Sequence, residues 1–164
     1  MKIVTRFSTK DDKDNIEELI LACFGDRSMF GVFDNLDCRY LLAFDKKRLV
    51  AMTGLTYSDI YHGYEIDWTC THPEYRGRGI MHQLFEKVCT MTKEPIYCSC
   101  WRQCTNEHVN LYKLMQDFGF EEVVKNRLTV DSRYNCPVAR TFCVYFNNQG
   151  SCRCCEDLYL RPKR

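Results

Sequence analysis

The sequence has no apolar run near the ~20 residues that a membrane-spanning helix requires, which excludes a helical membrane protein. It also has no excess of charge of either sign: 23 Lys and Arg residues balance 22 Asp and Glu residues, for a formal net charge of +1. So small a charge produces no field that would make nucleic acid the main partner. The first residues, Met1–Arg6, contain no apolar signal core, and we expect them to form a strand.

Cysteine, in contrast, is abundant, with 12 residues. Without a secretory signal, these cysteines argue against a disulfide framework and for a reducing compartment, so we expect a cytoplasmic protein. Two clusters raise the question of zinc, at positions 98, 100 and 104 and at positions 152, 154 and 155. No His-x-x-x-His pair accompanies either cluster, and the alternation of Cys98 and Cys100 is typical of two apolar side chains facing inward from one strand. We therefore predict no metal site, and a zinc-stabilised interaction domain is a minor alternative.

The chain length of 164 residues and a hydrophobic content of 45% predict one domain with a substantial core. We place this domain at residues 1–146, followed by a polar, Cys-rich tail at residues 147–164. The patterns of apolar residues predict helices at 13–24, 80–91 and 107–118, with Gly119 ending the last one. They predict strands at 1–6, 39–44, 49–58, 64–71, 96–101, 120–130 and 140–146, the second and third forming a hairpin.

A glycine-rich loop joins the predicted strand Tyr64–Thr71 to the helix that follows. Two glycines at a helix start let backbone N–H groups approach an anion, and the helix dipole favours that negative charge. Two arginines add cationic donors. This pattern indicates a pyrophosphate held at a helix N-terminus. The residues that would form the cradle are Arg76, Gly77, Arg78, Gly79, Ile80 and Met81.

The loop matches neither of two common phosphate motifs, because it lacks the third glycine of the dinucleotide fingerprint and the Gly-Lys-Ser/Thr of a Walker loop. It resembles instead the acyl-CoA loop of the GNAT N-acetyltransferase superfamily, Arg/Gln-x-x-Gly-x-Gly/Ala, with Met81 in place of the last small residue. The resemblance covers roughly residues 1–146. It implies a single-domain α/β (α+β) fold whose central mixed, mostly antiparallel sheet has six to seven strands and about four flanking helices. It also implies acetyl-CoA as cosubstrate.

Amide formation needs a neutral amine, although an amine with a pKa of about 10.4 is mostly protonated at neutral pH. A carboxylate must therefore accept a proton, directly or through water. Glu65 and Asp67 are two residues apart on the strand before the loop and so share one face. By resemblance, Glu65 occupies the position of the family's catalytic glutamate. We assign it as the general base and keep Asp67 as an alternative base or amine-binding group.

The resemblance implies three further roles. A backbone N–H near the end of the strand, at Cys70 or Thr71, would polarise the thioester carbonyl. Many members use a tyrosine four residues before a Gly-Phe pair to protonate the leaving thiolate; that position is Met115 here, and Tyr112 is the candidate substitute. His108 stands where the family frequently has an asparagine that contacts the pantetheine arm of the cofactor.

The function predicted from these features is transfer of an acetyl group from acetyl-CoA to a primary amine on a small molecule, protein or peptide. The alternative is a non-catalytic acyl-CoA-binding regulatory module, which Met81 and Met115 favour. The amine acceptor is the expected partner, and by resemblance a homodimer is one arrangement. We expect Gly25–Cys38, Asp59–Gly63 and Asp131–Pro137 to set acceptor specificity, and acidic residues in this part of the chain suit a cationic amine.

Overall fold

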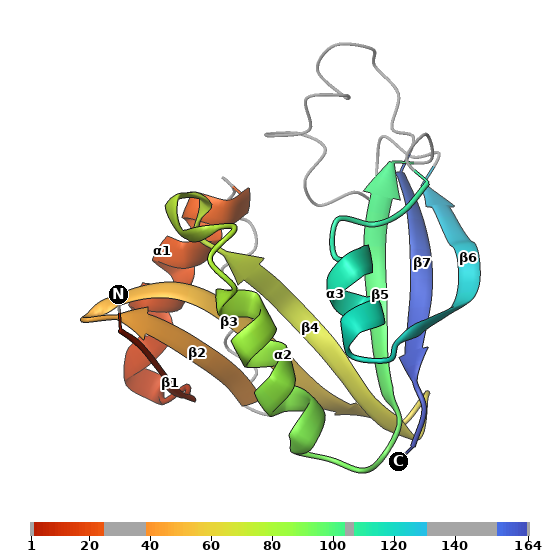
Figure 1. Ribbon diagram of the computed structural model, residues 1–164, viewed down its shortest axis with the longest axis horizontal. Coiled ribbons are helices and arrows are strands. Elements are labelled where there is room, and N and C mark those ends of the chain that lie inside the picture. The colour runs from red at the N-terminus through yellow and green to blue at the C-terminus, as the bar shows by residue number, and fades with distance from the viewer. Residues whose placement is uncertain (1, 25–38, 104–106, 131–153, 164) are drawn as a thin grey trace.

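The computed structural model describes residues 2–24, 39–103, 107–130 and 154–163, and these form one seven-stranded sheet with helices on both faces (Figure 1). The strands are β1 (Ile3–Phe7), β2 (Arg39–Asp45), β3 (Arg48–Ser58), β4 (Gly63–Thr71), β5 (Ile96–Gln103), β6 (Glu121–Val130) and β7 (Cys154–Arg161). The α-helices are α1 (Lys13–Phe24), α2 (Ile80–Thr90) and α3 (Tyr112–Asp117), and the 3-10 helices are η1 (Lys10–Asp12) and η3 (Pro73–Tyr75).

The strand order is β1-β2-β3-β4-β5-β7-β6, and only the β4–β5 pair is parallel. This confirms the predicted mixed, mostly antiparallel sheet and the predicted β2–β3 hairpin. Three α-helices lie in the described ranges, slightly fewer than the four expected. None of them is long and apolar enough to span a membrane.

The centre of the sheet opens between β4 and β5. These strands pair only at Tyr64–Ile96, Glu65–Tyr97 and Ile66–Cys98, whereas β5 pairs with β7 along its whole length. Beyond Ile66 the two parallel strands diverge, as Figure 1 shows. The carboxyl half of β4 therefore has a hydrogen-bonding edge that β5 does not cover.

Two hydrophobic cores lie on opposite faces of the sheet. On one face, α2 buries an apolar stripe against β2–β5 and β7; its buried residues are Ile80, Leu84, Phe85, Val88 and Cys89. The residues Met115 of α3 and Phe120 join this core. On the other face, α1 packs Ile16, Leu19 and Ile20 against β2, β3 and the end of β4. Burial of each large side chain contributes about 1.5–3 kcal/mol, so the two cores hold the helices around the opening between β4 and β5.

The third helix is shorter than predicted. The sequence pattern predicts a helix over 107–118, but α3 begins at Tyr112, and Leu111 at its N-cap position supplies no side-chain hydrogen bond. Its end is as predicted: Gly119 adopts φ 76°, Gly119 N–H donates to the Gln116 carbonyl, and Phe120 N–H donates to the Met115 carbonyl. This bond pattern is a Schellman motif, the usual ending of a helix at a glycine.

The last segment of the chain also differs from expectation. Cys154–Arg161, assigned from sequence to a tail beyond residue 146, forms β7 and lies between β5 and β6. Its buried Asp157 makes an ion pair with Arg102 of β5, with Nε 2.5 Å from Oδ2, which explains how a polar segment fits inside the sheet. The predicted strand 140–146 lies outside the described residues.

The cysteines of the described ranges mostly carry free thiols. Six of them are free, and Cys155 takes part in a disulfide bond. Cys98 and Cys100 point into the core with their sulfur atoms 3.5 Å apart, as predicted for apolar filler. No group of three or more metal-binding side chains occurs in the described residues.

Candidate functional site

The glycine-rich loop has the backbone conformation that only glycine adopts without strain. Gly77 and Gly79 have φ 72° and 71°, in the left-handed region, and Gly79 is the N-cap residue of α2. A Cβ atom added at either position would meet no heavy atom within 4 Å. The glycines are therefore required by the turn and leave open space above it, beside N–H groups of the first helical turn that have no intrahelical partner.

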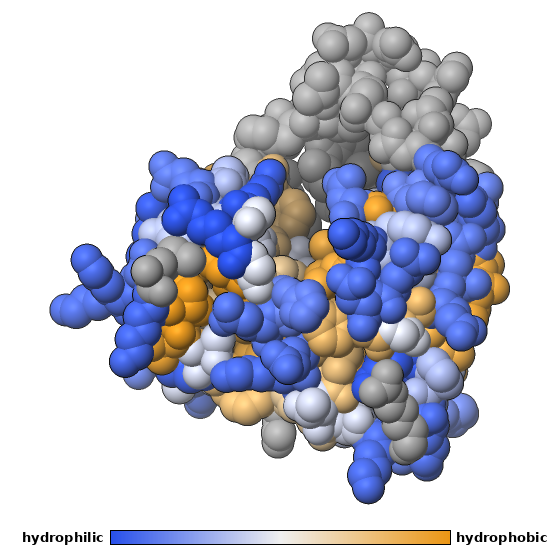
Figure 2. Space-filling view, in the orientation of Figure 1, coloured by the Kyte–Doolittle hydropathy of each residue, from blue (hydrophilic) through white to orange (hydrophobic). Residues whose placement is uncertain are grey.

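This open space is a depression of about 330 Å³. Loop residues and the start of α2 form most of its wall, and Leu114 of α3 and Thr71 of β4 complete it; the lining residues are Thr71, Tyr75, Arg76, Gly77, Arg78, Gly79, Ile80, Met81, His82 and Leu114. Figure 2 shows apolar surface in the hollow between α2 and α3, with polar side chains around it. All six residues predicted for the cradle line this depression.

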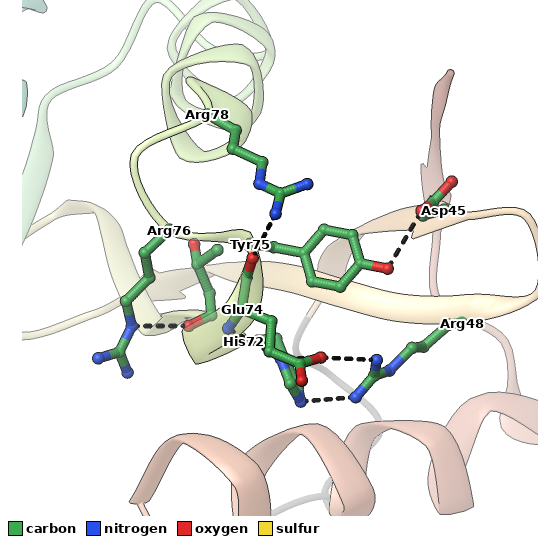
Figure 3. Close-up of polar contacts among 8 residues, drawn as sticks. Asp45, Arg48, His72, Glu74, Tyr75, Arg76 and Arg78 are labelled. Atoms are coloured by element: carbon green, nitrogen blue, oxygen red, sulfur yellow. Dashed lines mark hydrogen bonds and ion pairs between the residues drawn. The ribbon is translucent and has the colours of Figure 1, made fainter. Parts of the chain in front are cut away.

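The two arginines of the loop brace it from different sides (Figure 3). Arg76 donates from Nε to the Thr71 carbonyl at 3.1 Å, which ties the loop to the end of β4. Arg78 donates to the Glu74 carbonyl at 2.8 Å, and its guanidinium lies 5.1 Å from the centre of the Tyr75 ring. Both side chains are exposed, so both charges are in contact with solvent around the loop.

A polar network beside the loop was not foreseen from the sequence. The Tyr75 hydroxyl donates to Asp45 at 3.1 Å, and Arg48 forms a 3.0 Å ion pair with Glu74 (Figure 3). Arg48 also lies 2.8 Å from His72 Nε2, while the Glu74 N–H lies 3.3 Å from Nδ1. His72 thus contacts Arg48 through one ring nitrogen and accepts the Glu74 N–H at the other, as the N-cap residue of η3. The network joins the β2–β3 turn to the loop and holds it against the sheet.

Met81, the departure from the family motif, does not project wholly into the depression. Its side chain is half-buried and packs in part against the core beneath α2, and the preceding Ile80 is 2% exposed. The long, flexible side chain of methionine suits this position at a core boundary. A larger residue here is thus compatible with the open cradle around Gly77 and Gly79.

A β-bulge interrupts β4 beside the divergent edge. Asp67 pairs with Gly54 and Cys70 pairs with Met52, so two residues of β4 oppose one of β3, and Trp68 takes φ 48° there. His72 N–H donates to the Val50 carbonyl. By strand alternation, Cys70 then also bonds toward β3, while the N–H groups of Thr69 and Thr71 point away from it. By this alternation, the N–H of Thr71 points toward the divergent edge and the N–H of Cys70 points toward β3.

Glu65 and Asp67 lie together on one face of β4, as predicted from their spacing. Glu65 is half-buried and accepts a hydrogen bond from the Ser99 hydroxyl at 3.2 Å. Asp67 accepts from the N–H of Trp68 at 2.8 Å. Burial by its surroundings raises the pKa of Asp67, the Trp68 N–H lowers it, and the nearby charge of Glu65 raises it. The pKa of Asp67 is therefore raised above its ordinary value, although the side chain reaches solvent.

The candidate backbone donors on β4 lie at different distances from Glu65, the candidate base. Extended strand rises about 3.3 Å per residue, so roughly 20 Å of strand separates Glu65 from Thr71 and roughly 13 Å separates it from Thr69. A base acts within hydrogen-bond reach or through one water. Thr69 lies nearer to Glu65 along β4 than Thr71 does, and it was not predicted from the sequence because a bulge has no clear sequence signal.

His108 and Tyr112, the first residue of α3, form a stacked pair. Their ring centres are 3.7 Å apart at an interplanar angle of 5°, and the Tyr112 hydroxyl accepts from Gln116 at 2.8 Å, so its own proton stays available. The buried Nδ1 atom of His108 has no hydrogen-bond partner among the described residues. Met115 is 0% exposed within the core, so it is a packing residue.

Comparison with known proteins identifies relatives of this arrangement. The family model described as Acetyltransferase (GNAT) family matches residues 8–120, a range that holds all the candidate site residues of this subsection. No curated protein matches the chain. Among solved structures, the ribosomal-protein-S18-alanine N-acetyltransferase from Escherichia coli has a TM-score of 0.70 at 9% identity, over 99% of this chain and 94% of that one.

Two further solved structures were determined with a coenzyme bound. An aminoglycoside 6'-N-acetyltransferase complexed with coenzyme A has a TM-score of 0.68 at 12% identity, over 96% of each chain. A GNAT family acetyltransferase from Elizabethkingia anophelis with acetyl-CoA bound has a TM-score of 0.68 at 16% identity, over 99% of this chain and 98% of that one. At these identities the likeness concerns the fold.

Proposed function

The chain belongs to the acetyltransferase (GNAT) family, and from this premise we propose that it transfers an acetyl group from acetyl-CoA to a primary amine by direct attack. The observation that carries the proposal is the glycine cradle at the N-terminus of α2, open beside the uncovered edge of β4. Solved relatives bind coenzyme A or acetyl-CoA. We also propose a cytoplasmic location, because six of the seven cysteines in the described residues are free, Cys155 being the exception.

The chain offers a continuous path for the cosubstrate. N–H groups at Gly77–His82 would hold the pyrophosphate, with the helix dipole and Arg78 adding positive charge. The outward N–H groups of Thr71 and Thr69 line the way toward Glu65. The orphaned Nδ1 of His108 is a further polar group for the pantetheine arm. Open space at the glycines and backbone N–H groups at the start of α2 fit the pyrophosphate of an elongated cosubstrate.

Proton removal is assigned to Glu65. Acetyl-CoA supplies an activated thioester; the new N–C bond forms as the C–S bond breaks, and the amine gives up one proton. Glu65 accepts that proton directly or through one water, while the Ser99 hydroxyl holds its carboxylate in place. Asp67, two residues on, is assigned to hold the incoming ammonium group rather than to act as the base. Thr69 N–H is directed to donate to the carbonyl oxygen as negative charge develops there.

The leaving thiolate needs little help from the chain. A thiol pKa near 8.5 makes the thiolate a stable leaving group close to neutral pH. Tyr112 keeps its phenolic proton free while accepting from Gln116, and we assign it as the proton donor. The burial of Met115 leaves no acid at the usual family position, and this favours the second candidate function, a non-catalytic acyl-CoA-binding module.

Glu65→Gln separates the enzyme from the binding module. Parent protein, acetyl-CoA and a panel of primary amines are incubated, and acetylated product is measured by mass spectrometry. General-base catalysis contributes about 10²–10⁴-fold, so we expect kcat to fall by at least about 100-fold with the Kd for acetyl-CoA unchanged. Glu86→Gln, the same change at an exposed position on α2, is the control and should retain activity. A parent protein that binds acetyl-CoA but acetylates no amine would establish the module instead.

A further inference from the structure

One half of the sheet presents an acidic and aromatic face on the side of α1. In β4, Ile66 faces the core under α2, so its neighbours Glu65 and Asp67 face the opposite side. In β5, Cys98 and Cys100 face the same core. Because Glu65 is in register with Tyr97, the alternate residues of β5 share the face of the two carboxylates. We call this set the acceptor face; its residues are Glu65, Asp67, Tyr97, Ser99 and Trp101.

The first helix leaves this face open. The core under α1 contains residues of β2, β3 and the end of β4, and none of its described members comes from β5, β6 or β7. Trp101 is accordingly 51% exposed. Trp68 lies at the boundary between the α1 core and the acceptor face. It packs against that core, and its ring meets the Phe24 ring edge-on with the ring centres 6.4 Å apart. At the other end, Tyr97 stacks on Tyr61 at 4.5 Å. Aromatic rings therefore stand on both sides of the carboxylates.

Among the described residues, neither carboxylate of the acceptor face has a cationic partner. No Lys, Arg or His in the described ranges forms an ion pair with Glu65 or Asp67; their recorded polar contacts are the Ser99 hydroxyl and the Trp68 N–H. By comparison, other acidic side chains of the chain, such as Asp12 and Asp157, do pair with arginines. Two neighbouring negative charges without a counter-charge make a surface that attracts organic cations, and aromatic rings add cation–π attraction.

We propose that the acceptor is a linear diamine or longer polyamine, in which one amine reacts at Glu65 while Asp67 holds the second, protonated amine. Two residues of strand separate the carboxylates by roughly 7 Å, a separation that a short alkyl chain spans. Both groups are needed because Glu65 becomes neutral when it accepts the proton, whereas Asp67 stays charged and keeps the substrate in place. The exposed ring of Trp101 and the half-buried ring of Tyr97 suit the methylene groups between the two nitrogen atoms. This inference rests on the proposed function and adds the class of acceptor.

The raised pKa of Asp67 agrees with this role. Its surroundings and the charge of Glu65 both disfavour the carboxylate, and a bound ammonium ion would remove that disadvantage. Asn at this position keeps an oxygen that can accept the Trp68 N–H and removes only the charge. Asp67→Asn is therefore expected to fold normally, which circular dichroism and acetyl-CoA titration of the variant verify.

The test compares two amines with the same carbon chain, putrescine and n-butylamine, which differ in the second amino group. For the parent we expect kcat/KM to favour putrescine by at least about tenfold, equivalent to 1.4 kcal/mol. In Asp67→Asn this preference should fall to near one, through a higher KM for putrescine. Asp117→Asn makes the same chemical change at an exposed position of α3 and should keep the preference of the parent.

Three results would overturn the inference. Equal kcat/KM values for the two amines with the parent would show that the second cation is not recognised. An equal fall in kcat on both amines in Asp67→Asn would instead assign Asp67 as the base. In both cases the proposed acetyl transfer stands, because turnover is observed. Absence of turnover with every amine would overturn the inference together with the proposed function.

Discussion

Gly79→Ala adds one methyl group at the N-cap of α2, where an added Cβ meets no heavy atom within 4 Å. The cost to folding therefore comes from the backbone, since Gly79 has φ 71° and a side chain in the left-handed region costs about 1–2 kcal/mol. In a domain of this size that lowers Tm by roughly 2–8 °C. The cost to binding is separate, because the methyl group takes space that phosphate oxygens need beside the N–H groups. We expect the affinity for acetyl-CoA to fall at least about tenfold.

Gly119→Ala is the matched control for this change. Gly119 has φ 76° at the end of α3 and does not line the depression, so the variant should lose similar stability without losing affinity. Thermal unfolding measures the first effect and isothermal titration with acetyl-CoA measures the second. Unchanged affinity in Gly79→Ala would refute the phosphate cradle. Equal losses of affinity in the two variants would show that backbone strain, rather than lost space for phosphate, is responsible.

Three further predictions concern stability. Asp157→Asn leaves the buried guanidinium of Arg102 without its charge partner and should cost about 3–5 kcal/mol by chemical denaturation; a loss under 1 kcal/mol would contradict the buried pair. Arg6 lowers the pKa of Asp12 to about 2, so the ion pair stabilises the fold fully above the ordinary carboxyl pKa and loses this effect as the pH falls toward 2. Below about pH 5, the Tm of the parent should drop more steeply than the Tm of Asp12→Asn. Parallel curves of Tm against pH for the two proteins would contradict this. Met115→Tyr overfills the core and should cost about 1–3 kcal/mol without raising kcat; a faster enzyme would contradict the packing role.

The elements with strong local signals were predictable from the sequence. The stripe that begins at Ile80, the hairpin around Lys46 and the C′ glycine at Gly119 depend on residues close together in the chain, and the structure has all three. The glycine loop was predictable for the same reason. Its conformation follows from Gly77 and Gly79 themselves, since neither turn tolerates a side chain without strain.

Other features depend on partners far apart in the sequence. β7 looked like a polar tail because its charged residues are satisfied only in three dimensions, as Asp157 is by Arg102. The bulge that turns Thr69 outward arises from a mismatch between β3 and β4, which neither strand reveals alone. The openness of the acceptor face likewise depends on where α1 packs. Such features need the paired strands and helices to be seen together.

Acetyl transfer itself is the central claim, and isotope-labelled acetyl-CoA tests it most directly. The parent protein is incubated with acetyl-CoA carrying a heavy acetyl group and with a mixture of mono- and diamines, and the products are resolved by mass spectrometry. We expect a heavy N-acetylated diamine in one-to-one yield with free coenzyme A, and we expect Glu65→Gln to form much less of it. Binding of acetyl-CoA by titration with no heavy amide on any amine would contradict it and would establish a non-catalytic acyl-CoA-binding protein.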